Sequence, residues 1–87
     1  MADARELALY YHPFCPYCVR VLMALRGLDA PLVLHNVIIH PARRQELTAG
    51  GGRPTVPCLR IDQPDAPSRW MYESADIIDY LRQRFGG

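Results

Sequence analysis

Hydrophobic positions along the chain fall into short runs bounded by proline and glycine, and their spacing predicts alternating strands and helices. An apolar and aromatic run at residues 6–11 stops at a His-Pro pair, so we expect a first strand there. A helix is predicted to begin at Pro16, which suits a first helical turn, and to end at Gly27. Residues 32–39 are mostly aliphatic and β-branched, which predicts a second strand, buried over much of its length.

The second half of the chain continues the alternation. A polar helix is expected over residues 41–49, ended by three consecutive glycines. Residues 55–61 and 69–72 are predicted to be short strands joined by a long, turn-rich loop over residues 62–68. Ser74 is placed to cap a last helix. The apolar residues that share one face of this helix are Ile77, Ile78, Leu81 and Phe85.

This order, β-α-β-α-β-β-α, predicts an α/β fold with a single mixed four-stranded sheet and helices packed on both of its faces. A chain of 87 residues is sized for one core, so we expect residues 1–87 to form a single domain. Apolar residues make up 49% of the chain and charged residues 22%, which is typical of a globular domain and not of a disordered chain.

Charge and composition argue against two classes of partner, nucleic acid and membranes. Ten basic and nine acidic residues give a formal charge of +1, which is too small to attract nucleic acid. All ten cations are arginines, so a mechanism that needs a lysine amine is excluded. The start of the chain lacks the layout of a secretory signal, and no apolar run approaches membrane-spanning length. We therefore expect a cytoplasmic protein with no membrane partner.

Two of the three cysteines, Cys15 and Cys18, lie at the predicted junction between the first strand and the first helix. The positive end of the helix dipole and its free amides favour a thiolate at Cys15, whereas Cys18 is expected nearer the core and protonated. We predict that Cys15 attacks and Cys18 resolves, so that the pair forms a redox-active disulfide. The third cysteine, Cys58, is expected to be a small buried core residue.

Zinc binding is the main alternative function of the cysteine pair. His35 and His40 follow the two cysteines after a sixteen-residue spacer, which nearly matches a zinc finger. A finger needs its histidines about one turn apart on a helix, but here they are expected on a strand, where residues five apart point to opposite faces. We therefore predict no metal site.

Several motifs together resemble the glutaredoxin family. These are FCPYC between a strand and a helix, TVP about forty residues later, and a Glu-Ser pair opening the last helix. The segment 69–81 is more similar to the N-terminal domain of glutathione transferases and to transferase-like glutaredoxins. The resemblance covers nearly the whole chain, and it implies a thioredoxin-like fold and a cytoplasmic enzyme of electron transport and cell redox homeostasis.

The activity that the resemblance implies is glutathione-dependent thiol-disulfide exchange. Protein disulfides and glutathione-mixed disulfides would be reduced, with glutathione as cosubstrate and no tightly bound cofactor. The implied partners are glutathione and disulfide-containing or glutathionylated proteins, and we expect a monomer.

The resemblance also implies a glutathione site. In the segment Thr55-Val56-Pro57 the proline would be cis, and the backbone of Val56 would pair with the cysteinyl part of glutathione. Glu73 and Ser74 would hold the γ-glutamyl end. A carboxylate suits the ligand's ammonium group, and a helix start with a hydroxyl suits its carboxylate.

Three further residues complete this implied site. Arg53 would meet the glycyl carboxylate, and Tyr17 would pack along glutathione. His12 stands three residues before Cys15, where relatives often carry lysine, and it would be a weaker anchor because a histidine is only partly cationic near pH 7.

A binding module is the alternative to an enzyme. It would be either an iron-sulfur cluster carrier shared between two chains with glutathione, or a transferase-like domain that binds glutathione without turnover. Pro16 argues against the cluster, because cluster-binding relatives usually have glycine there.

Overall fold

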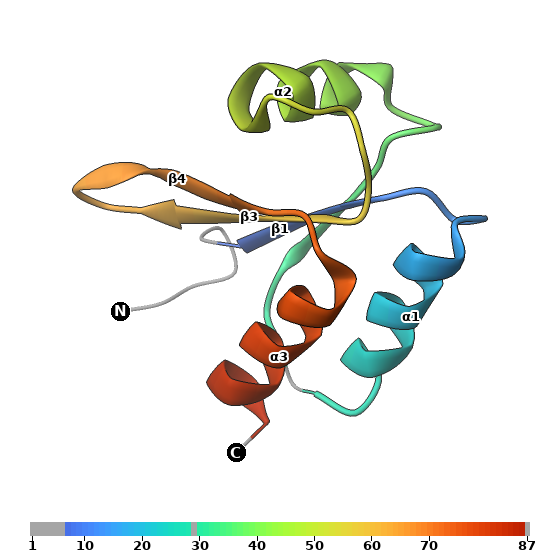
Figure 1. Ribbon diagram of the computed structural model, residues 1–87, viewed down its shortest axis with the longest axis vertical. Coiled ribbons are helices and arrows are strands. Elements are labelled where there is room, and N and C mark those ends of the chain that lie inside the picture. The colour runs from blue at the N-terminus through green and yellow to red at the C-terminus, as the bar shows by residue number, and fades with distance from the viewer. Residues whose placement is uncertain (1–6, 29, 87) are drawn as a thin grey trace.

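The computed structural model describes residues 7–28 and 30–86 (Figure 1). The elements follow one another as β1 (Leu7–Tyr11), α1 (Pro16–Leu25), β2 (Val33–Asn36), α2 (Pro41–Gly51), β3 (Cys58–Gln63), β4 (Ala66–Met71) and α3 (Ser74–Phe85). This is the predicted order of strands and helices. Of the predicted first strand, Glu6 lies outside the described residues.

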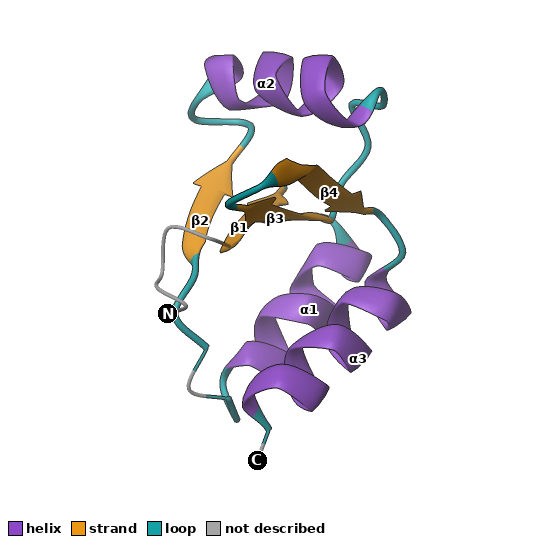
Figure 2. Ribbon diagram, turned by 90° about the vertical axis from the view of Figure 1, so that its left-hand side faces the viewer, coloured by secondary structure: helices purple, strands orange, loops and turns teal. Residues whose placement is uncertain are grey.

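The four strands form one mixed sheet in the order β2-β1-β3-β4, as predicted. Strand β1 pairs in parallel with β2 and antiparallel with β3, and β3 pairs antiparallel with β4. Helix α2 covers one face of the sheet, and α1 and α3 lie side by side on the other (Figures 1 and 2). A short loop, residues 12–15, connects the carboxyl end of β1 to α1.

Alternating side chains of the central strands build a core on each face of the sheet. Leu9 of β1 and Leu59 of β3 are fully buried against α1 and α3, together with Ile77 of α3. Tyr10 and Cys58, the neighbours of those leucines in the chain, are fully buried on the α2 side. This period of two is what a strand buried on both faces requires.

Polar contacts attach α2 to the sheet. The hydroxyl of Tyr10 donates to Oε1 of Glu46 at 2.5 Å, and Nη1 of Arg43 donates to Oε2 of the same carboxylate at 2.6 Å. Arg60 of β3 donates from Nε to Oδ1 of Asp62 at 2.8 Å, and its Nη1 lies 3.7 Å from Glu46. The carboxylate of Glu46 thus links α2 to the two central strands.

The second strand is shorter and more exposed than predicted. Strand β2 ends at Asn36, whose side-chain oxygen accepts hydrogen bonds from the backbone N–H groups of Ile38 (2.9 Å) and Ile39 (3.2 Å). This local turn stops the strand. Because β2 is an edge strand, Val33 and Leu34 remain 39% and 49% exposed, so the expectation of a largely buried strand was wrong.

Helix α2 continues through two of the three glycines that were predicted to end it. Gly50 and Gly51 are its last residues, and Gly52 ends the helix in a left-handed conformation with φ 89°. A Cβ atom at Gly50 would collide with the ring of Trp70, and one at Gly51 with the hydroxyl of Tyr72. These glycines therefore let the last turn of α2 approach β4 closely.

Two further boundaries differ from the prediction. Strand β3 begins at Cys58 instead of Thr55, and β4 already begins at Ala66, so the hairpin connection is tight. Ser74 is the first residue of α3, and the N-cap position is occupied by Glu73, with no capping hydrogen bond from its side chain. Ser74 was therefore wrongly predicted to be the cap.

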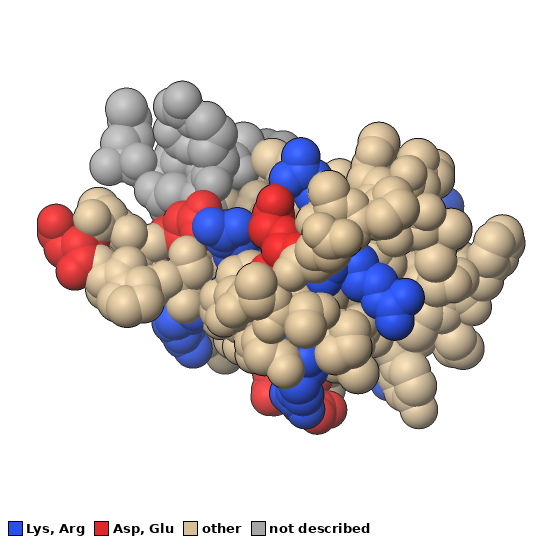
Figure 3. Space-filling model, turned by 90° about the horizontal axis from the view of Figure 1, so that it is seen from above, with Lys and Arg blue, Asp and Glu red and all other residues tan. Residues whose placement is uncertain are grey.

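The surface above α2 carries positive and negative side chains close together on a largely uncharged background (Figure 3). On this face, the described residues form no broad patch of one sign, which matches the formal charge of +1. Within residues 7–28 and 30–86, no helix has the length and apolar character needed to span a membrane.

Candidate functional site

Cys15 occupies the N-cap position of α1, at the point where the loop after β1 enters the helix. Its backbone is extended (φ −84°, ψ 123°), and its N–H donates to the carbonyl of His12 at 3.2 Å. Pro16 follows at the first helical position, where its lack of an N–H costs nothing. The sulfur of Cys15 is half-buried, so a disulfide can approach it from solvent.

Cys18 lies one turn further along α1 and is fully buried. Its sulfur accepts a hydrogen bond from the backbone N–H of His12 at 3.4 Å. All three cysteines are free thiols, so this is the reduced form of the pair. The predicted placement of an accessible Cys15 above a buried Cys18 is confirmed.

The surroundings of the two thiols shift their pKa values in opposite directions. Burial tends to raise the pKa of Cys15, but the backbone N–H and thiol of Cys18 and the backbone N–H of Tyr17 stabilise its thiolate, and the net pKa is lowered. Neither amide makes a capping bond of ordinary geometry, so they act as nearby positive dipoles at the helix start. Burial raises the pKa of Cys18 to about 12, and the neighbouring Cys15 sulfur adds to the rise.

A pocket of about 300 Å³ lies beside this helix start. Its walls come from the first turn of α1, the loop between α2 and β3, and the connection from β4 to α3. The lining residues are Tyr17, Arg53, Thr55, Val56, Pro57, Tyr72, Glu73 and Ser74. The tertiary structure thus brings together seven of the eight residues proposed from the sequence for ligand binding.

The backbone in this pocket has the expected shape. The Val56-Pro57 peptide bond is cis, as the resemblance implied. Val56 is half-buried, and within the described residues no backbone group pairs with its N–H or C=O. Arg53 and Glu73, both described, form no ion pair with each other. The pocket therefore offers one cation, one carboxylate and an unpaired backbone segment to a ligand.

His12 is the predicted site residue that does not line the pocket. Its Nδ1 accepts a hydrogen bond from the backbone N–H of Phe14 at 3.0 Å, and the two rings meet edge to face with centroids 5.9 Å apart. His12 therefore shapes the loop before Cys15, and its backbone, not its ring, contacts the buried thiol of Cys18.

Tyr72 is a pocket residue that the sequence analysis missed. Its hydroxyl donates to the carbonyl of Arg53 at 3.0 Å and accepts from the Arg53 N–H at 3.4 Å. The sequence contains one indication of this role. Trp70 and Tyr72 alternate along the predicted strand 69–72, and the glycines that make room for their side chains, Gly50 and Gly51, are also consecutive. Without the fold, these glycines read only as a helix end.

Cys58 lies behind the pocket and is fully buried, as predicted. Burial raises the pKa of its thiol to about 12, and the nearby Tyr72 hydroxyl and Met71 backbone oppose this rise only in part. A buried, protonated thiol has no access to a disulfide substrate. Cys58 is therefore part of the pocket's support.

No cluster of three or more His, Cys, Asp or Glu side chains suited to a metal ion occurs in the described part of the chain. His35 packs against Tyr10 with ring centroids 5.0 Å apart, on the sheet face that α2 covers. The arrangement that a zinc finger would need, with both histidines facing the cysteine pair from one helix, is thus not formed by these residues.

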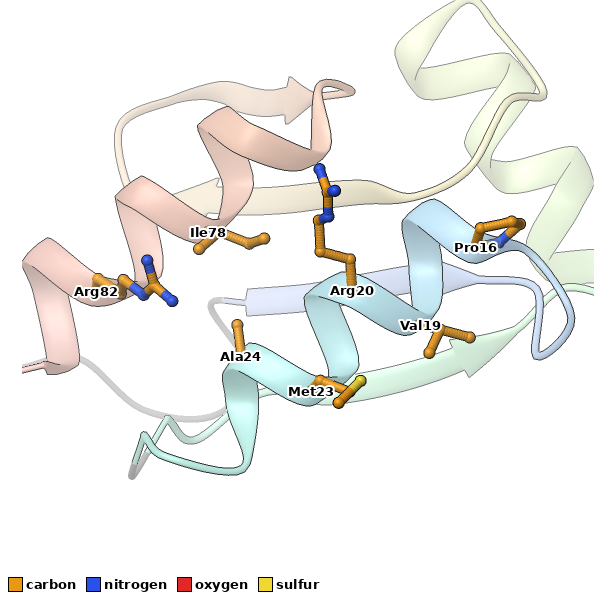
Figure 4. A pocket seen from close by; sticks show the side chains of 7 residues that line it. All are labelled: Pro16, Val19, Arg20, Met23, Ala24, Ile78 and Arg82. Atoms are coloured by element: carbon orange, nitrogen blue, oxygen red, sulfur yellow. The ribbon is translucent and has the colours of Figure 1, made fainter.

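A larger hollow of about 620 Å³ runs between α1 and α3 on the outer face of these helices (Figure 4). Val19 and Met23 of α1 and Ile78 of α3 provide its apolar surface, and Arg20 and Arg82 lie along it. None of the described residues that line this hollow carries a thiol or a carboxylate. Of the two, only the smaller pocket is lined by a carboxylate, that of Glu73.

Residues 9–87 match the family model described as glutathione S-transferase, N-terminal domain. Over 75 residues the chain is 33% identical to Glutaredoxin 2 of Escherichia coli strain K12. This match covers 86% of the chain and 32% of the relative, so the chain spans about a third of the length of that relative.

Solved structures of transferases superpose on the chain. A trimeric glutathione transferase of Leishmania, TDR1, does so with a TM-score of 0.71 at 30% identity, covering 91% of this chain and 18% of its own. A possible glutathione S-transferase from Rhodopseudomonas palustris gives a TM-score of 0.67 at 28% identity, with coverage of 91% and 40%. These likenesses confirm the thioredoxin-like fold. Because the matched residues take in nearly the whole chain, the protein belongs to the glutathione S-transferase N-terminal domain family.

Proposed function

We propose that the chain binds glutathione in the pocket beside α1 and uses Cys15 for glutathione-dependent thiol-disulfide exchange. The observation that carries this proposal is the position of a thiol with a lowered pKa at a helix start, beside a pocket that pairs a cation with a carboxylate. A lowered pKa provides the thiolate that attacks disulfides at neutral pH. The substrates are glutathione-mixed disulfides and protein disulfides.

The pocket matches the charges of glutathione, which carries two carboxylates and one ammonium group. Arg53 suits the glycyl carboxylate, and Glu73 with Ser74 at the start of α3 suits the γ-glutamyl end. The unpaired backbone of Val56 suits the backbone of the cysteinyl residue, as an added strand would. With the ligand in this orientation, its sulfur points toward α1 and Cys15.

Reduction of a glutathione-mixed disulfide needs only one protein thiol. The Cys15 thiolate attacks the glutathione sulfur, a Cys15-glutathione disulfide forms, and the substrate thiol leaves as a thiolate that takes a proton from water. A second glutathione thiolate then attacks the glutathione sulfur of this disulfide. Oxidised glutathione leaves, and the Cys15 thiolate is restored.

Reduction of a protein disulfide uses both cysteines. Burial is the main cause of the raised pKa of Cys18, and when Cys15 has formed a mixed disulfide with the substrate, its negative charge no longer adds to that rise. The N–H of His12 then stabilises a Cys18 thiolate, which attacks Cys15 and releases the reduced substrate. Two glutathione molecules afterwards reduce the Cys15-Cys18 disulfide and become oxidised glutathione.

The decisive test is a glutathione-coupled assay of mixed-disulfide reduction, run beside an assay coupled to thioredoxin reductase. We expect turnover with glutathione and little with thioredoxin reductase. Glutathione binding without turnover would instead indicate a non-catalytic transferase-like domain. Visible absorbance in the freshly purified protein, lost together with iron, would indicate an iron-sulfur cluster carrier.

A further inference from the structure

The side chain of Tyr72 contacts Arg53 in three ways. Its hydroxyl donates to the Arg53 carbonyl at 3.0 Å and accepts from the Arg53 N–H at 3.4 Å. The Arg53 guanidinium lies over the Tyr72 ring, with its central carbon 4.2 Å from the ring centroid. One tyrosine therefore holds both the backbone and the charged group of a residue 19 positions away in the chain.

The Tyr72 hydroxyl is itself fixed by its surroundings. The buried thiol of Cys58 lies near enough for it and the hydroxyl to influence each other's pKa, and Gly51 leaves the space that the hydroxyl occupies. A tyrosine hydroxyl has one proton to donate and two lone pairs to accept with. Donation to the Arg53 carbonyl and acceptance from the Arg53 N–H use the proton and one of these lone pairs.

The Arg53 side chain lies at the border of two hollows, so without a support it could extend into either one. It lines the 300 Å³ pocket and also a neighbouring hollow of about 430 Å³ on the β4 side. In the described part of the chain, no carboxylate forms an ion pair with its guanidinium. An arginine without a partner samples many rotamers, and the entropy lost on ordering it weakens ligand binding.

We propose that Tyr72 is a positioning residue, which holds Arg53 at the border of the pocket so that a ligand carboxylate meets a pre-organised guanidinium. The identity of that ligand, glutathione with its glycyl carboxylate, rests on the proposed function. Tyr72 acts through Arg53 and has no part in the reaction at Cys15. Gly51 contributes by leaving space for the hydroxyl.

The test uses Tyr72→Phe, which keeps the ring and removes the hydroxyl. Tyr80→Phe is the matched control, because the Tyr80 hydroxyl accepts a 2.7 Å hydrogen bond from Arg84 on α3, outside the pocket. Each variant is measured for the glutathione Michaelis constant, the turnover number and the rate of Cys15 alkylation. Amide hydrogen exchange at Arg53 is followed in the same proteins, with the Gly52 amide, bonded to the Thr48 carbonyl at 2.9 Å, as internal reference.

We expect Tyr72→Phe to raise the glutathione Michaelis constant by about three- to tenfold, the effect of one lost hydrogen bond. Exchange at the Arg53 amide should accelerate while that at Gly52 does not, and the turnover number and the alkylation rate should stay within about twofold. In an Arg53→Ala background, Tyr72→Phe should raise the Michaelis constant by less than about twofold, because Tyr72 acts through Arg53. Tyr80→Phe should change none of these quantities.

Three results would overturn the proposal. An unchanged exchange rate at the Arg53 amide in Tyr72→Phe would show that Tyr72 does not hold the Arg53 backbone. Faster exchange with an unchanged glutathione Michaelis constant would show that this contact does not contribute to glutathione binding. An equal effect of Tyr72→Phe with and without Arg53 would assign Tyr72 a direct or a general structural role. If the wild-type protein does not turn over glutathione, the proposed function is wrong, and hydrogen exchange alone then decides whether Tyr72 holds Arg53.

Discussion

The thiol of Cys18 lies fully buried one helical turn after the half-buried Cys15, close enough to stabilise a thiolate on the Cys15 sulfur. The two cysteines therefore differ in burial and in thiol pKa in the free protein. The outer sulfur gains a donor that stabilises its thiolate, and the inner one is kept protonated by burial. The proposed attack by Cys15 and resolution by Cys18 rest on this asymmetry.

The first prediction concerns the two cysteines. Cys15→Ser should abolish all thiol transfer, because no other accessible thiol is present among the described residues. Cys18→Ser should retain removal of glutathione from mixed disulfides, which needs one nucleophile, and should lose protein disulfide reduction. Glutathione-coupled assays with both substrate types would measure this, and an equal loss in both variants would contradict the assignment.

The second prediction concerns acidity. The alkylation rate of Cys15 should show a pKa below the ordinary free-thiol value of about 8.5, because the helix start and Cys18 stabilise its thiolate. Cys18→Ala removes one of these donors and should raise the Cys15 pKa toward that value. The pH profile of iodoacetamide alkylation measures both values, with Cys58→Ala as a control that leaves the pair intact. A Cys15 pKa that does not respond to Cys18→Ala would contradict the stabilisation of the Cys15 thiolate by Cys18.

The third prediction concerns the carboxylate of the pocket. Glu73→Lys should raise the glutathione Michaelis constant by about tenfold or more, because a charged hydrogen bond is lost and a like charge faces the ligand's ammonium group. Asp79→Lys makes the same charge change on the exposed surface of α3, outside the pocket, and should have little effect. Equal Michaelis constants for the two variants would place the γ-glutamyl end elsewhere.

The fourth prediction concerns the contact between Tyr10 and Glu46. Hydrogen bonds from Tyr10 and Arg43 outweigh burial and lower the pKa of Glu46, so its stabilising effect is present above the unfolded value near 4.5 and is lost as pH falls through the folded value. Glu46→Gln should therefore lower the free energy of unfolding by about 1–2 kcal/mol at pH 7, and by much less at pH 3.

Urea denaturation at the two pH values measures this difference. Asp79→Asn removes a negative charge from exposed α3 and controls for the change in net charge. A stability difference between wild type and Glu46→Gln that stays the same from pH 7 to pH 3 would contradict the ionised hydrogen-bonded pair.

Local chemistry explains which elements could be predicted from the sequence. Pro16 marked the start of α1 because its ring suits a first helical turn, and the spacing of Ile77, Ile78 and Leu81 marked the buried face of α3. The prediction of a buried strand over residues 32–39 was wrong because of the strand's position in the sheet. Its apolar residues indicated burial, but a strand at the edge of a sheet is covered on fewer sides.

The chain by itself therefore determined the order of strands and helices, the two-sided core and the location of the Cys15–Cys18 pair, because these depend on neighbours close in sequence. Only the tertiary structure decided that Tyr72 reaches Arg53 and that His12 turns toward Phe14 instead of the pocket. It also decided that Gly51 belongs to the helix. Tyr72 and Gly51 owe their roles to contacts with residues distant in the chain, and such contacts depend on how the packed helices and strands meet in space.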